Sequence, residues 1–324
     1  MHRMLALGLS AIALGFGAVL VAKAQSYPAQ IIRILVPAAP GGPNDVPARL
    51  AAQVLQPKLG QPVVVEHRPG AGGAIAMREA AKARPDGYTL MAAGASQLAV
   101  IPALSASAGY DPTRDFTPVA KFMESFQVLV VHPTAPWRTV ADLVADGRAH
   151  PGKYNFAHSG TASLPQLAGE LFNARTGANL VGVPYRSGGE SVTAVLGQTV
   201  QMAFENVTLL LPLVREGKLR ALAVTSPTRT ALAPDLPTMT EAGVPDYEVT
   251  TFFGIVAPAR TPASIVAVLN AAINQALMTP EMQATIDKLG ALPQAGSPAE
   301  LGATIAAHYQ KWRVFGEQAN IKID

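Results

Sequence analysis

The chain of 324 residues contains no cysteine, and it has few charged and few aromatic residues, at 15% and 6%. Without cysteine, neither a disulfide bond nor lipid attachment through a cysteine thiol is possible. Charged residues usually make up about a quarter of a soluble domain, whereas 49% of this chain is hydrophobic. The composition therefore predicts a large buried core that no covalent cross-link stabilises.

The N-terminus has the pattern of a secretory signal peptide. His2 and Arg3 precede an uncharged run from Leu5 to Val21, and the small-residue motif AKA follows it. An uncleaved anchor is the alternative, because a run of about 17 residues is the shortest that spans a membrane. The AKA motif favours cleavage after Ala24. We therefore expect residues 1–24 to be removed and the mature protein to be periplasmic, with no stable insertion in the membrane.

The predicted mature chain is almost neutral. Loss of Arg3 and Lys23 leaves 23 basic and 22 acidic residues, a net charge of +1. A protein that binds nucleic acid needs a basic face or stripe, and the cations here are scattered along the chain. We expect no nucleic-acid partner, and the remaining 300 residues are long enough for two domains.

Apolar runs of strand length alternate with segments of helical periodicity. Continuous apolarity is typical of strands that helices cover on both faces, as in parallel sheets. Between the runs, apolar residues such as Leu50, Val54 and Leu55 recur every three or four positions. The alternation predicts an α/β fold with mostly parallel sheets flanked by helices. The predicted strands are IIRILVP, PVVVEHR, YTLMAAG, QVLVVHP, YNFAHSG, NLVGVPY, VQMAFEN, LRALAVTS and TFFGIVAP.

The stretch VPAAPGGPND, Val36 to Asp45, joins the first predicted strand to a predicted helix. Gly41 and Gly42 allow positive φ and a close approach of another molecule. The first N–H groups of the helix have no intrahelical partner, so together with the helix dipole they form an anion site that needs no Lys or Arg. Asn44 or Asp45 is placed to cap the helix. The alternative is a plain tight turn before a capped helix.

A second corner of this kind is HSGTASLPQLAGELF, which begins at His158. Ser159, Gly160, Thr161 and Ser163 lie between a predicted strand and a predicted helix. They form either a second anion cradle or a helix cap. Two such corners favour ligand binding, because α/β proteins bind ligands outside the carboxyl ends of their parallel strands.

Motifs for catalysis and for metals are weak. GAGGAI resembles a dinucleotide fingerprint, but its sixth position is Ile75 and a secreted protein is an improbable user of a soluble nicotinamide cofactor. The histidines have no metal-ligand spacing. His158 beside Ser159 leaves a secreted serine hydrolase as an alternative function, although adjacent strand residues face opposite ways. We expect no enzyme activity, no cofactor and no metal.

One internal repeat is present. VPAAPGG (Val36–Gly42) and VPYRSGG (Val183–Gly189) share the pattern V-P-x-x-x-G-G. The pattern either arises by chance in a chain with 28 Gly and 27 Pro, or it marks equivalent strand-to-helix corners of two related lobes.

Beyond these patterns, the chain resembles a known family in its specific motifs. The segment from YPAQIIRILVPAAPGGPNDVPARL to ARPDGYTL, followed by GELF, VPYRSGG, GKLRALAVTSPTR, APDLPTMTEAGVPDYE and GIVAPARTP, is similar to the receptors of tripartite tricarboxylate transporters, the Bug-type receptors. The resemblance covers essentially the whole mature chain. It implies a two-lobed, Venus-flytrap fold of the type II periplasmic-binding-protein kind, with lobe 1 at residues 25–127 plus 251–324 and lobe 2 at residues 128–250.

The resemblance also implies the site. The loop at Pro40–Asp45, with Ala38 and Ala39 before it, corresponds to the family loop that closes on a carboxylate. Ser159–Ser163 corresponds to the opposing loop, and Asn206 in FENV lies at another cleft-lining strand end. Two positions depart from the family pattern. Ala38 stands where many relatives have an aromatic residue and Gln166 where many have histidine, which predicts a roomier pocket.

Partners follow from the same resemblance. It implies a monomer that captures a small organic anion and delivers it to the membrane permease subunits of a tripartite tricarboxylate transporter. A receptor that serves a sensor kinase is the alternative.

Overall fold

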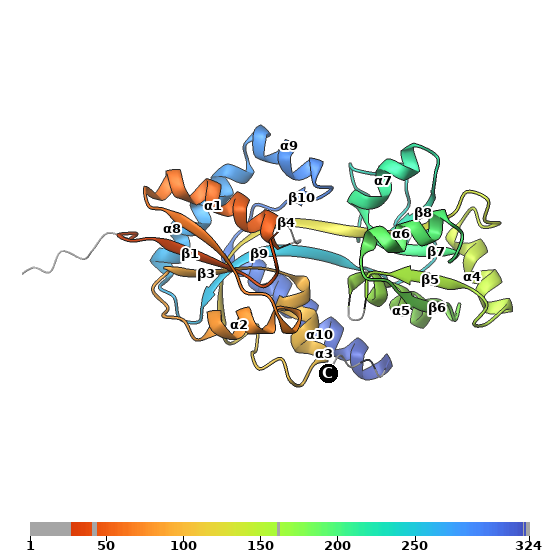
Figure 1. Cartoon of the computed structure of the whole chain (residues 1–324), viewed down its shortest axis with the longest axis horizontal. Coiled ribbons are helices and arrows are strands. Elements are labelled where there is room, and N and C mark those ends of the chain that lie inside the picture. The colour runs from red at the N-terminus through yellow and green to blue at the C-terminus, as the bar shows by residue number, and fades with distance from the viewer. Residues whose placement is uncertain (1–26, 41–43, 161–162, 320, 322–324) are drawn as a thin grey trace, which may run out of the picture.

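The computed structural model describes residues 27–40, 44–160, 163–319 and 321. The predicted signal peptide, Gly41, Gly42 and Thr161 lie outside this part of the chain. Two α/β lobes lie side by side, and two long strands, β4 (Phe116–Val131) and β9 (Thr250–Pro258), run between them (Figure 1).

The sheet of the first lobe contains the predicted N-terminal strands. β1 (Ile32–Val36) pairs in parallel with β2 (Val63–His67) and with β3 (Thr89–Gly94). β9 pairs antiparallel with β3 and with β4, and the short β10 (Leu292–Pro293) adds to β4. The strand order is therefore β2-β1-β3-β9-β4.

The second sheet repeats this plan. β5 (Asn155–His158) pairs in parallel with β6 (Val181–Pro184) and with β7 (Met202–Asn206). The far half of β4 pairs antiparallel with β7 and with β8 (Arg220–Val224). All nine predicted strands are thus present.

The prediction of mostly parallel sheets is wrong, because the sheets are mixed. β4 and β9 pair only antiparallel. Helices cover both sheets on both faces, so β9 and the far half of β4 are as continuously apolar as the parallel strands. Apolarity reports burial and not strand direction. The prediction also missed residues 116–126 of β4, in which polar residues interrupt the apolar run.

The two lobes are related by topology. In each, a central strand (β1 or β5) is flanked by the next two strands of the chain, β2 and β3 or β6 and β7. The corner after β1 is therefore equivalent to the corner after β5. The repeat V-P-x-x-x-G-G instead lies at the corner after β1 and at the corner after β6. By topology, however, the corner after β6 corresponds to the corner after β2. Of the two interpretations of this repeat, the one as equivalent corners does not agree with the topology.

Helices cover both faces of the first sheet. α1 (Asp45–Leu59) and α8 (Ala263–Leu277) pack on one face through Ala51, Leu55 and Leu269. The opposite face packs against α2 (Ala74–Ala81) and the start of α10 (Pro298–Ala319). Other helical segments of this lobe are η1 (Ala71–Gly73), η2 (Ser96–Val100), α3 (Ile101–Leu104) and α9 (Pro280–Lys288).

The second sheet is covered in the same way. α4 (Val140–Ala149) and α5 (Leu164–Thr176) pack on the face that contains Phe156 and Phe204. α6 (Gly188–Leu196) and α7 (Val207–Arg215) pack on the other face. The helices predicted from the spacing of apolar residues after the first strand and after YNFA are thus present, as α1 and α5.

The C-terminal helix α10 braces the two lobes. Leu301 and Ile305 near its start belong to the core of the first lobe. Trp312 and Phe315 near its end share one apolar cluster with Leu171 and Phe172 of α5. The helix therefore packs on both lobes, and its middle contacts the strand β9 that runs between them, through His308 against Phe252 with ring centroids 5.1 Å apart.

His308 makes the stability of this brace dependent on pH. Burial, helped by the positive charge of Lys311, lowers the pKa of His308 to about 4. Its Nδ1 atom is buried without a hydrogen-bond partner in the described part of the chain. In the unfolded chain, the pKa of a histidine is about 6.5. The free energy of unfolding is therefore at its full value above pH 6.5. It decreases by up to about 3 kcal/mol as pH falls from 6.5 towards 4, because the unfolded chain binds a proton that the folded one does not.

We expect the variant His308→Gln to lose this part of the acid sensitivity. Urea unfolding at pH 7.0, 5.5 and 4.5 measures it. The free energy of unfolding should fall more steeply for the parent than for the variant over that range. Parallel profiles would contradict the assignment.

In the parts of the chain that can be described, no single helix has both the length and the hydropathy of a membrane span. α8 and α9 meet these criteria only when taken together, and they are bent by 79°.

Candidate functional site

The strand directions bring the two predicted corners face to face. β4 leaves the first lobe at Phe126 and enters the second at Gln127, where it pairs with Asn206 at the end of β7. β7 is antiparallel to β4, so β7 and the parallel β5 end at the junction between the lobes. By the same reasoning β3 and β1 end there, because Gly94 pairs with Phe253 near the start of β9. The carboxyl ends of both parallel sets therefore point to one junction.

At the first corner, Ala38 is half-buried, Ala39 is exposed, and Asn44 and Asp45 are buried. Asn44 occupies the position before α1, but its side chain does not cap the helix. Its Nδ2 donates instead to Gln97 Oε1 at 3.2 Å. Because Gln97 Nε2 donates to the carbonyl of Gly72 at 2.9 Å, the orientation of both amides is determined.

Asn44 consequently presents an acceptor. Its Oδ1 is buried and has no hydrogen-bond partner among the described residues. The nearest atom to a Cβ built on Gly94, after the Phe253 ring, is this oxygen at 3.1 Å. An unpartnered buried acceptor is costly, so this oxygen is placed to accept a hydrogen bond from water or from a donor group of a bound molecule.

The side chain of Asp45 bonds to other residues of the first lobe. Its Oδ1 lies 2.7 Å from His67 Nε2, and its Oδ2 accepts from Arg49 Nε at 2.9 Å. These contacts join the start of α1 to the end of β2. The carboxylate is thus engaged within the scaffold of the first lobe.

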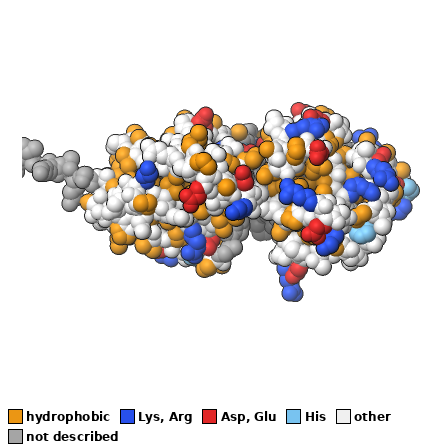
Figure 2. Space-filling model, turned by 90° about the horizontal axis from the view of Figure 1, so that it is seen from above, with side chains coloured by type: hydrophobic (Ala, Val, Ile, Leu, Met, Phe, Trp, Pro, Cys, Tyr) orange, Lys and Arg blue, Asp and Glu red, His pale blue; other side chains and the backbone are white. Residues whose placement is uncertain are grey.

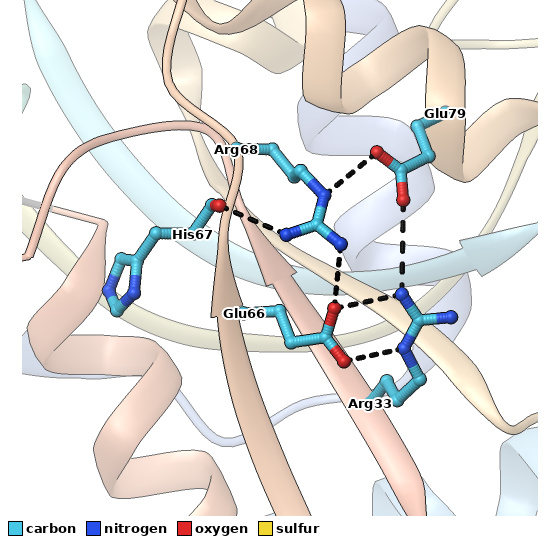
Figure 3. Close-up of polar contacts among 5 residues, drawn as sticks. All are labelled: Arg33, Glu66, His67, Arg68 and Glu79. Carbon is cyan, nitrogen blue, oxygen red and sulfur yellow. Dashed lines mark hydrogen bonds and ion pairs between the residues drawn. The ribbon is translucent and has the colours of Figure 1, made fainter.

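A charged network stabilises the same edge of the first lobe. Figure 3 shows Arg33 of β1 and Arg68 beside Glu66 of β2 and Glu79 of α2. The Arg33–Glu66 pair is bidentate, at 2.7 and 2.8 Å, and Arg68 Nη2 donates to Glu66 at 2.8 Å. Hydrogen bonds from Arg33 lower the pKa of Glu66. The network connects two strands and a helix, so it supports the scaffold of the corner and lies outside the predicted ligand residues.

At the second corner, Ser163 has two partners. Its Oγ accepts from the N–H of Gln166 at 3.3 Å, which caps α5, and donates to the carbonyl of Gly160 at 2.7 Å. Gly160 has φ +105°, which favours glycine. His158 Nδ1 bonds to the same carbonyl at 2.9 Å. The helix-cap alternative is therefore correct for Ser163, and the side chains of His158 and Ser163 converge on one carbonyl oxygen.

The serines of this corner do not form a nucleophile–base pair with histidine among the described residues. His158 is buried and its ring is directed to Gly160, while Ser163 is engaged by the helix cap. Burial lowers the pKa of His158. In the described ranges, no group of three or more His, Asp or Glu side chains is arranged to hold a metal ion.

Asn206 joins the lobes. Its Oδ1 caps α7 by accepting from the N–H of Thr208 at 3.0 Å, and its Nδ2 donates to Ser125 Oγ at 3.1 Å. Ser125 in turn donates to the carbonyl of Gly290 at 3.0 Å. Gly290 lies so close to Thr208 that a Cβ there would be 2.3 Å from its methyl group. These bonds make Asn206 part of a contact between the lobes.

Glu205 is a further polar residue at the junction and was not among the predicted site residues. This carboxyl lies at the end of β7, is only 3% exposed, and interacts with the hydroxyl of Ser159. Burial raises its pKa to about 7. The signal in the sequence was a single charged residue within the apolar run VQMAFEN.

Three cavities of the described structure lie away from both corners. A groove of about 400 Å³ between α5 and α10 contains Arg175 and Lys311. Others of about 510 and 350 Å³ lie against α8 and beside Trp137. None of the three is lined by a predicted site residue.

Charge on the surface is dispersed. Figure 2 shows acidic and basic side chains interspersed over both lobes, with a waist between them. The stretches Val36–Asp45 and His158–Gln166 contain neither Lys nor Arg.

Comparison with known proteins gives consistent results. The family model described as "Tripartite tricarboxylate transporter family receptor" matches residues 47–321. BugT of Bordetella pertussis is 38% identical over 291 residues, which cover 90% of this chain and 89% of that protein.

Two solved structures are similar over most of their length. Rpa4515 of Rhodopseudomonas palustris, with adipate, is 32% identical with a TM-score of 0.77, covering 91% of this chain and 99% of that one. MatC of the same organism, with bound malate, is 32% identical with a TM-score of 0.73, covering 89% and 99%. The predicted two-lobed periplasmic-binding-protein fold is confirmed.

Proposed function

Because the chain belongs to the tripartite tricarboxylate transporter receptor family, of the Bug type, we propose that it captures a small carboxylate between its lobes. Relatives of known structure hold adipate and malate. The proposal includes delivery of the cargo to the permease subunits of a tripartite tricarboxylate transporter by a periplasmic monomer whose signal peptide, residues 1–24, is cleaved.

The observation that carries the proposal is the pair of equivalent corners. The N-termini of α1 and α5 follow the carboxyl ends of β1 and β5, and both strands end at the junction. Neither corner contains Lys or Arg. Main-chain N–H groups, hydroxyls and helix dipoles are therefore the groups that would bind the anion.

The magnitudes suffice for a transport receptor. Hydrogen bonds to a charged group contribute about 1.5–3 kcal/mol each, and a helix N-terminus about 0.3–1 kcal/mol. Four such bonds and two termini contribute roughly 7–14 kcal/mol. Immobilisation removes at least about 4 kcal/mol. A micromolar Kd corresponds to about 8 kcal/mol, which lies within reach without a buried cation.

We propose the lobe boundaries at residues 25–127 with 251–324, and at residues 128–250. The change of partner of β4 between Phe126 and Gln127 supports the first crossing. The last β4–β9 pair, Phe126 with Thr250, supports the second. Hinge motion at these two positions would open the lobes for capture and release.

The proposed site residues differ in the contacts that they make. Ser159, Gly160 and Ser163 form the described part of the second corner. At the first corner, Asn44 Oδ1 has no partner among the described residues and would bind a hydroxyl of the cargo or a bridging water, not the carboxylate itself. Asp45 and Asn206 have partners within the protein and would act by positioning. The small side chain of Ala38 would leave room for a longer diacid.

A thermal-shift screen tests the function. The panel contains malate, adipate, citrate, aspartate and benzoate, with adipamide as the uncharged counterpart of adipate. An acid at 100 times its Kd should stabilise the protein by about 2.7 kcal/mol, which raises the Tm by several degrees. Equal shifts by adipate and adipamide, or no shift by any acid, would contradict carboxylate capture.

A further inference from the structure

Glu205 is a buried carboxyl with no counter-charge among the residues that the structure describes. It pairs with Val128 in the β4–β7 ladder and is 3% exposed. Its Oε1 has no hydrogen-bond partner in the described structure. A Cβ built on Gly188, in the first turn of α6, would lie 2.8 Å from its Oε2 and 2.8 Å from Leu209 of α7. The group is thus enclosed by a strand and two helices.

No charged side chain compensates Glu205 within the described ranges. On α6, Glu190 turns away and accepts from the N–H of Arg186 at 3.2 Å. On α7, Arg215 is directed to the carbonyl of Leu232. On β8, Arg220 donates to the carbonyls of residues 133, 135 and 137. On β5, His158 lies on the opposite face of the sheet, with Phe156 and Phe204.

The isolation of this carboxyl favours its neutral form. Burial of an ionised carboxylate without a partner is costly. Burial accordingly raises the pKa of Glu205 to about 7, against smaller opposing effects of Ser191, the Asn206 N–H and Ser159. Ser191 is close, yet its Oγ makes no well-formed hydrogen bond to a described residue.

Glu205 lies directly beside the second corner. β5 and β7 run in parallel with Ala157 opposite Ala203. Two residues further on, Ser159 and Glu205 therefore lie side by side on the same face. Their side chains interact. The charge of Glu205 would act on an anion held at this corner.

We propose that Glu205 must be protonated for an anion to bind beside Ser159, the described residue of the second corner that it contacts, so that capture of the cargo takes up a proton and a rise in pH releases it. This inference rests on the proposed function. Two unit negative charges at a separation of roughly 6 Å, in an effective dielectric constant of about 20, repel each other enough to weaken binding about 100-fold. Carboxyl groups with a pKa of about 4 are ionised above pH 6, so the titration of such an acid does not contribute. Citrate is left out of this test because its last carboxyl titrates at a higher pH.

The test is calorimetry with the tightest acid of the panel other than citrate between pH 6.5 and 8.5, in HEPES and in Tris, whose ionisation enthalpies differ and neither of which is a small anion. For the parent, we expect the affinity to fall at least tenfold across this range. The apparent enthalpy should differ between the buffers by an amount that reports uptake of up to one proton. Glu205→Gln should bind the acid with an affinity that does not change with pH and an enthalpy that does not change with the buffer.

Glu170→Gln is the matched control. Glu170 is a half-buried glutamate on α5 whose pKa burial also raises, and its replacement should leave the parent's pH dependence intact. A flat profile for the parent would overturn the proton linkage, as would an unchanged profile in Glu205→Gln. Loss of binding by a folded Glu205→Gln would also overturn it, because the carboxyl would then be a direct ligand contact.

A second readout needs no ligand. A carboxyl whose pKa is raised on folding lowers the stability as pH rises from its unfolded value, near 4.5, to about 7. The Tm of Glu205→Gln should exceed that of the parent by an increasing margin over this range and by a constant margin above it. No binding of any acid by the parent would overturn the receptor function and the linkage together. Binding without pH dependence would overturn the linkage alone.

Discussion

Replacement of Gly169 by alanine is expected to destabilise the protein by about 3 kcal/mol, the upper range for overpacking a core. A Cβ at this position of α5 would lie 2.1 Å from Phe156 Cε2 and 2.3 Å from its Cζ. The Phe156 ring is fully buried and packs edge-on against Phe204 at 6.0 Å. It cannot retreat without displacing the strand that leads to the second corner. Urea unfolding at pH 7 measures the effect.

Gly189→Ala is the matched control, since alanine is normally the better residue inside a helix by roughly 0.5–1 kcal/mol. Gly189 also lies in a helix of the second lobe, and the nearest atom to its Cβ would be Ser187 Oγ at an ordinary 3.9 Å. Its replacement should be neutral or stabilising. If Gly169→Ala were as stable as the parent, the packing of α5 on β5 described above would be incorrect.

Replacement of Gly160 by valine is expected to weaken binding of the best carboxylate at least 100-fold. A β-branched residue is strongly disfavoured at φ +105°, so the turn must rearrange. The carbonyl of Gly160 holds both His158 and Ser163. Loss of two hydrogen bonds to the anion, at about 1.5–3 kcal/mol each, corresponds to a 100-fold to 10⁴-fold effect. Calorimetry measures it.

Gly152→Val separates strain from binding. Gly152 also has positive φ, at +75°, and a Cβ there would meet no atom within 4 Å. It precedes β5, so it lies at the end of the sheet away from the junction. This variant should share the cost of backbone strain but bind as tightly as the parent. Equal affinities of the folded Gly160→Val variant and the parent would remove the second corner from the site.

The fold could be predicted in its elements but not in all their pairings. The runs around Ile32, Phe156 and Phe204 predicted strands correctly, because a strand that is buried on both faces has a continuous apolar sequence. The direction of β4 and β9 could not be predicted. It depends on which strands of the chain become neighbours, such as β3 and β9, which lie more than 150 residues apart.

In the candidate site, too, local features could be predicted and contacts between distant residues could not. Ser163 was recognised as a cap or a cradle residue because helix starts have local signatures. The partner of Asn44, in contrast, is Gln97, 53 residues further on. No local pattern distinguishes an asparagine that caps its own helix from one that bonds a distant amide.

By itself, the sequence determined the α/β class, the positions of the two strand-to-helix corners and membership of the receptor family, because these depend on residue order within short windows. Only the tertiary structure decided the mixed sheets, the contact between Gly290 and Thr208, and the unpaired burial of Glu205. The physical reason is that charge state and strand direction depend on neighbours brought together from distant parts of the chain. Glu205 is an ordinary acidic residue in the sequence, and it gains a pKa of about 7 only where two helices and a sheet exclude water from it.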